Sequence, residues 1–147
     1  MTCSLMISYS HVNIDFCRQL YDILSAIPKL SISVDFNTGK YLWKDIVETL
    51  VQADLIVFLL SKDFFYDKSC RQELIYVTDK LKTLFFPIFI DQNFKSTGWL
   101  HKRIARLKSI QFDKTNPIMR NSLDIKQWSD KEVKEWFMKN DILPELD

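Results

Sequence analysis

Apolar and polar residues follow a regular order along the first 113 residues. Five short apolar or alternating segments are typical of β-strands, and the segments between them repeat apolar residues at helical spacing. The predicted strands are residues 5–7, 31–36, 55–60, 84–90 and 109–112, and the predicted helices begin at Asn13 or Asp15, at Tyr41, at Cys70 and at Gly98. This order predicts an α/β fold with a parallel sheet of about five strands, helices on both faces and right-handed crossovers.

The predicted strands differ in their pattern, and the pattern indicates their place in the sheet. Residues 55–60 (LIVFLL) are apolar without alternation, as expected for a central strand with both faces covered. Residues 31–36 alternate, which is typical of a strand near a sheet edge. Pro87 has no N–H to donate, so we expect its strand to lie near an edge or to contain a bulge.

A polar segment, residues 61–69, is predicted as a loop between the central strand and a helix over residues 70–81. That helix carries Glu73 in its first turn. Because open α/β sheets bind ligands beyond the carboxyl ends of their strands, Glu73 is a candidate site residue. The alternative is that Glu73 is only a favourable acid at a helix start. Trp43, in the preceding helix, is predicted on the core face.

After Asp113 the pattern changes. A polar stretch with Pro117 indicates a linker, and a capping box from Ser129 to Glu132 starts a further helix. We therefore predict an α/β domain over residues 1–115, a linker over 116–124 and a C-terminal helix over 125–147. The aromatic side of this helix either folds back on the α/β domain or begins a second domain that this sequence contains only in part.

The composition excludes several classes of function. A formal net charge of +1 argues against binding nucleic acid or anionic membrane through basicity, and the apolar runs are too short to span a bilayer. Two glycines are too few for a Gly-rich phosphate loop. No secretory signal is visible and the three cysteines form no C-x-x-C pair, so we expect reduced thiols in a cytoplasmic protein. Two histidines provide neither a metal cluster nor a catalytic triad with clear spacing.

Five segments of the sequence form an ordered set: Met6-Ile7-Ser8-Tyr9-Ser10, Val34-Asp35-Phe36 with residues 37–41 after it, Ala53-Asp54-Leu55 through Leu60-Ser61, Cys70-Arg71-Gln72-Glu73-Leu74, and Phe86-Pro87-Ile88. Together these segments resemble the TIR (Toll/interleukin-1 receptor) domains. The resemblance covers roughly residues 5–113 and implies a flavodoxin-like, three-layer TIR fold. The tail W-S-D-K-E-V-K-E-W-F looks like the opening of a SAM domain, so residues 125–147 resemble the start of a truncated SAM domain.

Some members of this family cleave NAD+, and the resemblance to them assigns residue roles. Their essential glutamate lies in a C-x-x-E motif that falls on Glu73, and NAD+ is their substrate, with no separate cofactor. The implied substrate-binding residues are Tyr9, Ser10, His11, Phe36, Gly39, Lys40, Tyr41 and Cys70. The alternatives are a core aromatic at Tyr9, a solvated charge at Lys40 and a small buried residue at Cys70. Many family members have Trp where this chain has Ser69, which weakens the transfer of nucleotide-binding detail.

The chemistry expected of Glu73 needs only one carboxylate. Ordinary glycosidases use two carboxyl groups because their leaving group must be protonated. The nicotinamide of NAD+ is a pyridinium that departs as a neutral molecule, so a single carboxylate can stabilise the oxocarbenium charge and hold the ribose hydroxyls. A position in the first helical turn is expected to keep that carboxylate ionised.

The resemblance thus implies two functions. The first is a TIR-type NAD+ glycohydrolase that forms nicotinamide and ADP-ribose or a cyclic ADP-ribose, is activated by assembly, and acts in innate-immune or cell-death signalling. SAM-mediated oligomerisation is its expected trigger. The second is a non-catalytic adaptor that signals by homotypic TIR–TIR interaction.

Overall fold

The computed structural model describes residues 2–35, 43–81, 83–91, 93–105 and 110–111. In these residues a parallel five-stranded sheet has the strand order β2-β1-β3-β4-β5. The strands are β1 (Cys3–Ser8), β2 (Leu30–Val34), β3 (Leu55–Leu60), β4 (Leu84–Phe89) and β5 (Ile110–Gln111). The helices are α1 (Ile14–Ser25), α2 (Trp43–Gln52), α3 (Lys62–Tyr66), α4 (Lys68–Asp79) and α5 (Gly98–Ile104), with a short 3-10 helix η1 at His11–Asn13. The predicted α/β class and parallel sheet are confirmed.

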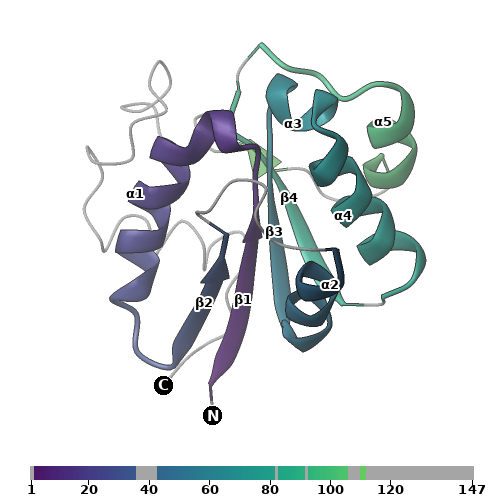
Figure 1. Cartoon of the computed structure of the whole chain (residues 1–147). Coiled ribbons are helices and arrows are strands. Elements are labelled where there is room, and N and C mark those ends of the chain that lie inside the picture. Colours follow the sequence, from purple (N-terminus) through teal and green to yellow (C-terminus); the bar gives the residue numbers. More distant parts are fainter. Residues whose placement is uncertain (1, 36–42, 82, 92, 106–109, 112–147) are drawn as a thin grey trace.

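Helices cover both faces of the sheet (Figure 1). Among the described elements, α1 packs on one face and α2, α3, α4 and α5 pack on the other. Burial of both faces explains the unbroken apolar sequence of β3. Val57 and Leu59 belong to the core under α1, while Ile56 and Phe58 belong to the core on the opposite face. All six residues of β3 are buried, as the central position requires.

The edge predictions are also confirmed. Strand β2 lies at one edge of the sheet and pairs with β1. Strand β4 is next to the short edge strand β5, which pairs with Ile88 and Phe89 in the described residues. Pro87 pairs with Phe58 of β3 and lies immediately before the residues that pair with β5, so it is near the sheet edge as predicted.

The prediction of a loop over residues 61–69 is wrong. Residues Lys62–Tyr66 form α3, because Ser61 Oγ accepts a hydrogen bond of 3.1 Å from the Phe64 N–H and the Phe64 ring is fully buried. Helix α4 then begins at Lys68, with Asp67 as its N-cap. Glu73 consequently lies in the second turn of α4 and not in the first.

Two further predictions have different outcomes. Trp43 does not belong to the sheet core: it is half-buried and meets Tyr76 of α4 edge to face, with 5.6 Å between ring centroids. The predicted linker over 116–124, the helix over 125–147 and its resemblance to a SAM domain lie outside the described residues. Within the described residues, no helix is long and apolar enough to cross a membrane.

Candidate active site

Strands β1 and β3 are neighbours, so their carboxyl ends lie side by side along the C-terminal edge of the sheet, the edge formed by the strand ends. Polar residues follow both strands. Strand β1 ends at Ser8 and leads into Tyr9 and Ser10, while β3 leads into Ser61. Ser61 Oγ donates to Asn13 Oδ1 over 2.8 Å, so the segments that follow the two strands are joined directly. In an open α/β sheet this edge is where ligands bind.

Helix α4 brings Glu73 to this edge. The start of α4 is set by Asp67, whose Oδ1 accepts from the N–H of Ser69 at 2.8 Å and of Cys70 at 3.1 Å. Leu74 is fully buried against the sheet and fixes the rotation of the helix. Glu73 is therefore half-buried, and its Oε1 accepts a hydrogen bond from Ser8 Oγ at 3.4 Å, the long end of the usual range.

The environment of Glu73 disfavours its charged form. Burial raises the pKa of Glu73 from 4.5 to about 8, the Ser8 hydrogen bond lowers it, and the nearby Asp67 and Asp35 carboxylates raise it. The expectation that the helix dipole keeps this carboxylate ionised is therefore wrong. The helix dipole acts mainly on the first turn, and Glu73 lies in the second turn. The loss of water around the carboxylate therefore raises its pKa by more than the single hydrogen bond from Ser8 lowers it.

A pocket of about 270 Å³ lies at this edge. The described residues that line it are Tyr9, His11, Asp35, Ile46, Asp67, Ser69, Cys70 and Glu73. Four of the residues predicted for the site therefore meet around one cavity: Tyr9, His11, Cys70 and Glu73. Three of the lining residues, Asp35, Asp67 and Glu73, are acids, and none of the described lining residues is Lys or Arg.

The residues after β1 have different roles in this arrangement. Tyr9 belongs to the core under α1 and donates from its hydroxyl to the Asp35 carbonyl over 2.6 Å, so one side chain serves both the core and the pocket wall. His11 lies against the Tyr9 ring, with centroids 5.1 Å apart, and its buried Nδ1 has no hydrogen-bond partner among the described residues. Ser10 is buried, caps η1 through the Val12 N–H, and is not among the lining residues.

Cys70 and Ser69 lie at the α4 side of the pocket. Cys70 is 2% exposed, and burial raises the pKa of its thiol, so it is a protonated wall residue and not a nucleophile. Ser69 is exposed and also lines the pocket, so the wall is polar at this position.

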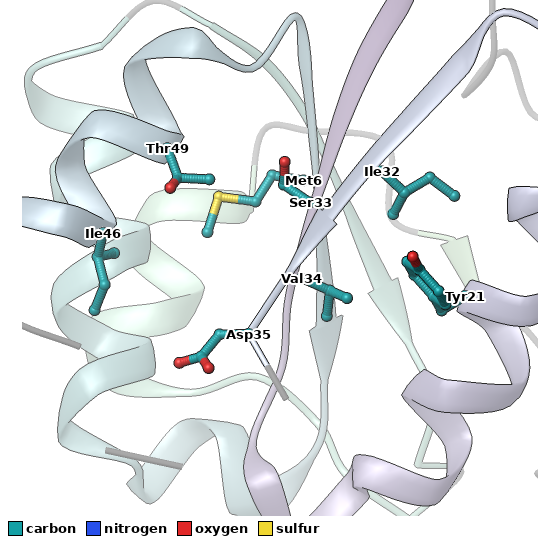
Figure 2. A pocket seen from close by; sticks show the side chains of 8 residues that line it. All are labelled: Met6, Tyr21, Ile32, Ser33, Val34, Asp35, Ile46 and Thr49. Carbon is teal, nitrogen blue, oxygen red and sulfur yellow. The ribbon is translucent and has the colours of Figure 1, made fainter. Parts of the chain in front are cut away.

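The remaining predicted residues, Phe36, Gly39, Lys40 and Tyr41, lie outside the described residues. A second pocket of about 330 Å³ adjoins the first, since Asp35 and Ile46 line both. Figure 2 shows Asp35, Ile46 and Thr49 on the α2 side of strand β2, with Tyr21 and Ile32 on the α1 side. The two pockets together extend the site from Glu73 towards the outer strand β2.

Sequence reasoning missed three polar residues of the site. Ser8 is the last residue of β1, Asp35 follows β2 directly, and Asp67 caps α4. Asp67 had a recognisable signal, because an acid just before a helix start is a common N-cap. Within the described residues no group of His, Cys, Asp and Glu is placed to hold a metal ion.

Comparisons with known proteins agree with this fold. The TIR domain family model matches residues 5–124 of the chain. The TIR domain of the Toll-related receptor TRR-2 from Hydra magnipapillata superposes with a TM-score of 0.61 at 12% identity, covering 92% of this chain and 95% of that one. The TIR domains of the activated Roq1 resistosome, which directly recognises the pathogen effector XopQ, superpose with a TM-score of 0.58 at 11% identity, covering 95% of this chain and 99% of that one. A comparison with curated proteins finds no match.

Proposed function

The chain belongs to the TIR domain family, and from this premise we propose that it is an NAD+ glycohydrolase with Glu73 as its catalytic residue. One observation supports the proposal above all. Glu73, in the C-x-x-E segment, lies half-buried in an acidic pocket at the carboxyl ends of the strands, held by Ser8. This is a position in which a carboxylate can act on a substrate that carries a positive charge.

The positive charge of the substrate is expected to lower the raised pKa of Glu73. In the free protein at neutral pH this carboxyl is mostly protonated. A nicotinamide ring in the pocket brings a pyridinium charge near Glu73, and an opposite charge at close range favours the carboxylate. Substrate binding therefore releases a proton from Glu73 and creates the active form of the catalyst.

The reaction then follows from the charges. The bond between ribose C1′ and the pyridinium nitrogen breaks, its electron pair stays on nitrogen, and neutral nicotinamide leaves. The Glu73 carboxylate stabilises the positive charge that develops on the ribose and holds its hydroxyls. Water adds to C1′ and loses a proton to solvent, which gives ADP-ribose; attack by a nitrogen of the adenine ring would instead give a cyclic ADP-ribose.

The reactive end of the substrate fits the pocket around Glu73 better than the whole dinucleotide does. At about 270 Å³ this pocket is just below the roughly 300–1,000 Å³ of small-molecule sites. The adjoining pocket beside β2 provides further room. We propose that homotypic TIR–TIR association, aided by the segment that resembles a SAM domain, activates the enzyme in cytoplasmic immune or cell-death signalling.

The test is NAD+ turnover by the full chain at high concentration and under crowding. Wild-type protein is expected to release nicotinamide, and Glu73→Ala is expected to lose this activity by at least about 100-fold, the range seen for removal of one electrostatic group. Glu48→Ala, an exposed acid on α2, is the matched control and should keep full activity. Equal turnover by Glu73→Ala would refute the assignment of Glu73.

The second candidate is a non-catalytic adaptor that acts through TIR–TIR contacts. The raised pKa of Glu73 is compatible with this function, because a neutral carboxyl can still accept the hydrogen bond from Ser8 Oγ without any part in catalysis. Absence of turnover by wild-type protein under every condition that assembles it, together with assembly that survives Glu73→Ala, would establish this function in place of the enzyme.

A further inference from the structure

A groove of about 380 Å³ lies between α2 and α4, apart from the pocket that holds Glu73. The residues that line it are Trp43, Lys68, Arg71, Gln72, Ile75, Tyr76, Asp79 and Lys80. They include no member of the Glu73 pocket, although α4 contributes to both. Helix α4 therefore presents two separate surfaces of different chemistry.

The floor of this groove is aromatic. Trp43 and Tyr76 are half-buried and pack edge to face, and Ile75 lies half-buried beside them. Trp and Tyr are the side chains that contribute most often to binding energy at protein interfaces, because they bury a large area at low entropic cost. This floor is suited to receiving one or two apolar side chains of a partner.

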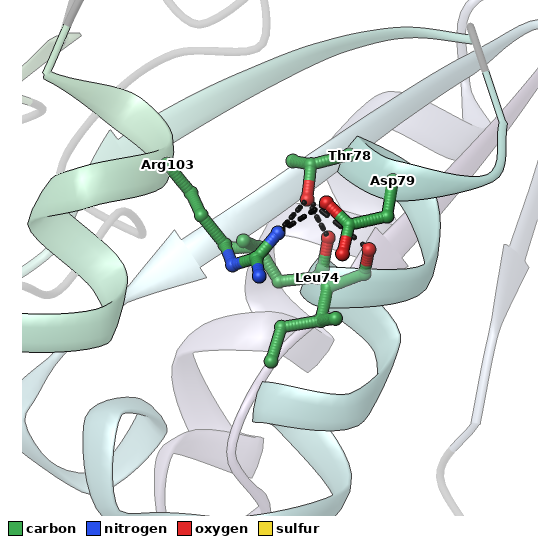
Figure 3. Close-up of polar contacts among 5 residues, drawn as sticks. Leu74, Thr78, Asp79 and Arg103 are labelled. Atoms are coloured by element: carbon green, nitrogen blue, oxygen red, sulfur yellow. Dashed lines mark hydrogen bonds and ion pairs between the residues drawn. The ribbon is translucent and has the colours of Figure 1, made fainter.

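The rim of the groove is basic. Lys68, Arg71 and Lys80 are exposed, and the single acid of the lining, Asp79, forms an ion pair with Arg103 of α5. Arg103 also donates to Thr78 Oγ1 over 3.0 Å, which fixes the guanidinium on the α5 side of Asp79 (Figure 3). The charge left facing an incoming ligand is therefore positive, whereas the Glu73 pocket is acidic.

We propose that this groove docks an acidic, amphipathic segment of a partner protein. Apolar side chains of that segment lie on Trp43 and Tyr76, and its carboxylates meet the ammonium groups of Lys68 and Lys80. Charge complementarity of this kind selects the partner and speeds its association. The proposal does not depend on NAD+ cleavage, since it uses none of the residues of the Glu73 pocket.

The experiment measures fluorescence anisotropy of two labelled peptides with the full chain: the acidic EDLFEDLFE and its basic counterpart KKLFKKLFK. The acidic peptide is expected to bind, and the basic peptide is not.

Lys68→Glu with Lys80→Glu should weaken binding of the acidic peptide about tenfold or more, because two attractions become repulsions. Lys62→Glu with Lys102→Glu makes the same change of charge on exposed lysines outside the groove and should leave the affinity within about twofold. All four lysines are exposed, and equal melting temperatures will verify that the variants fold.

Several outcomes would overturn the proposal. One is the absence of binding by the acidic peptide, and another is an equal loss of affinity in the two double variants. Self-association of the free chain that Lys68→Glu with Lys80→Glu abolishes would assign the groove to a second copy. Binding to phosphatidylserine vesicles that is lost in the same variant, without binding of the peptide, would assign it to a membrane surface.

Discussion

Replacement of Glu73 by Gln is expected to stabilise the folded protein at neutral and alkaline pH while it abolishes NAD+ cleavage. Gln has nearly the same shape as Glu, and its carbonyl oxygen can still accept the hydrogen bond from Ser8 Oγ. The one property that the substitution removes is the ability to ionise. Stability and activity should therefore move in opposite directions.

The size of the effect follows from the two pKa values. The pKa of Glu73 is 4.5 in the unfolded chain and about 8 in the folded protein. At pH values between these two, the folded state binds more protons at Glu73 than the unfolded state does, so the free energy of unfolding falls as the pH rises through this range. From pH 5 to pH 8 the loss amounts to roughly 3.5 kcal/mol at about 1.36 kcal/mol per pH unit. Because Glu73 is only half-buried, solvent screens part of this effect, and we expect about 2 kcal/mol.

Urea unfolding at pH 5 and pH 8 measures this difference. The free energies of unfolding of wild-type protein and Glu73→Gln should lie close together at pH 5, and the variant should be more stable by about 2 kcal/mol at pH 8. Glu48→Gln, the same chemical change at an exposed position of α2, controls for the loss of one negative charge. Parallel pH curves for wild type and Glu73→Gln would refute the claim that burial raises the pKa of Glu73.

Three further predictions use the same geometry. In NAD+ turnover, kcat/KM is expected to rise about tenfold per pH unit below pH 8 and to level off above it, because the free enzyme must lose the Glu73 proton; a flat profile would contradict a carboxylate catalyst. Ser8→Ala removes the hydrogen bond that lowers the pKa of Glu73, so this limb of the pH profile should move to higher pH, whereas Ser4→Ala should leave it in place. Asp67→Ala removes the N-cap of α4 and should cost about 1 kcal/mol in urea unfolding, while Asp67→Asn should cost only a few tenths.

The strands of this fold could be predicted from the sequence because each carries its own pattern. The apolar run of β3 and the alternation of β2 reflect burial on two faces and on one face, and both patterns are local. Helix α3 could not be predicted in this way. Its five residues are too few to show a helical stripe, and its stability comes from Phe64 in the core and the Ser61 cap, which only the fold provides.

In the candidate site, too, the features with a local sequence pattern could be predicted and those set by distant residues could not. Glu73 could be located through its spacing from Cys70, which resembles a known motif, and Tyr9 and His11 through their place after the first strand. The pKa of Glu73 could not be predicted, because it depends on Ser8 and Asp35, which are 65 and 38 residues away in the sequence. The start of α4 has a different origin: the helix begins at Lys68, two residues before the predicted Cys70, because Asp67, which the polar pattern places in a loop, is its N-cap.

The energetic cost of Glu73 is itself an argument for a chemical role. A carboxyl whose pKa is raised by burial reduces the stability of the fold at neutral pH, and a Gln or a Leu at this position would avoid that cost. Among the described residues, Leu74 and Cys70 already hold α4 against the sheet and Asp67 already caps it, so their packing does not require the acid. A cationic ligand recovers part of the cost by stabilising the carboxylate, so binding energy is largest for a substrate that brings positive charge into the pocket. The position of Glu73 is thus better suited to a pyridinium substrate than to a purely structural role.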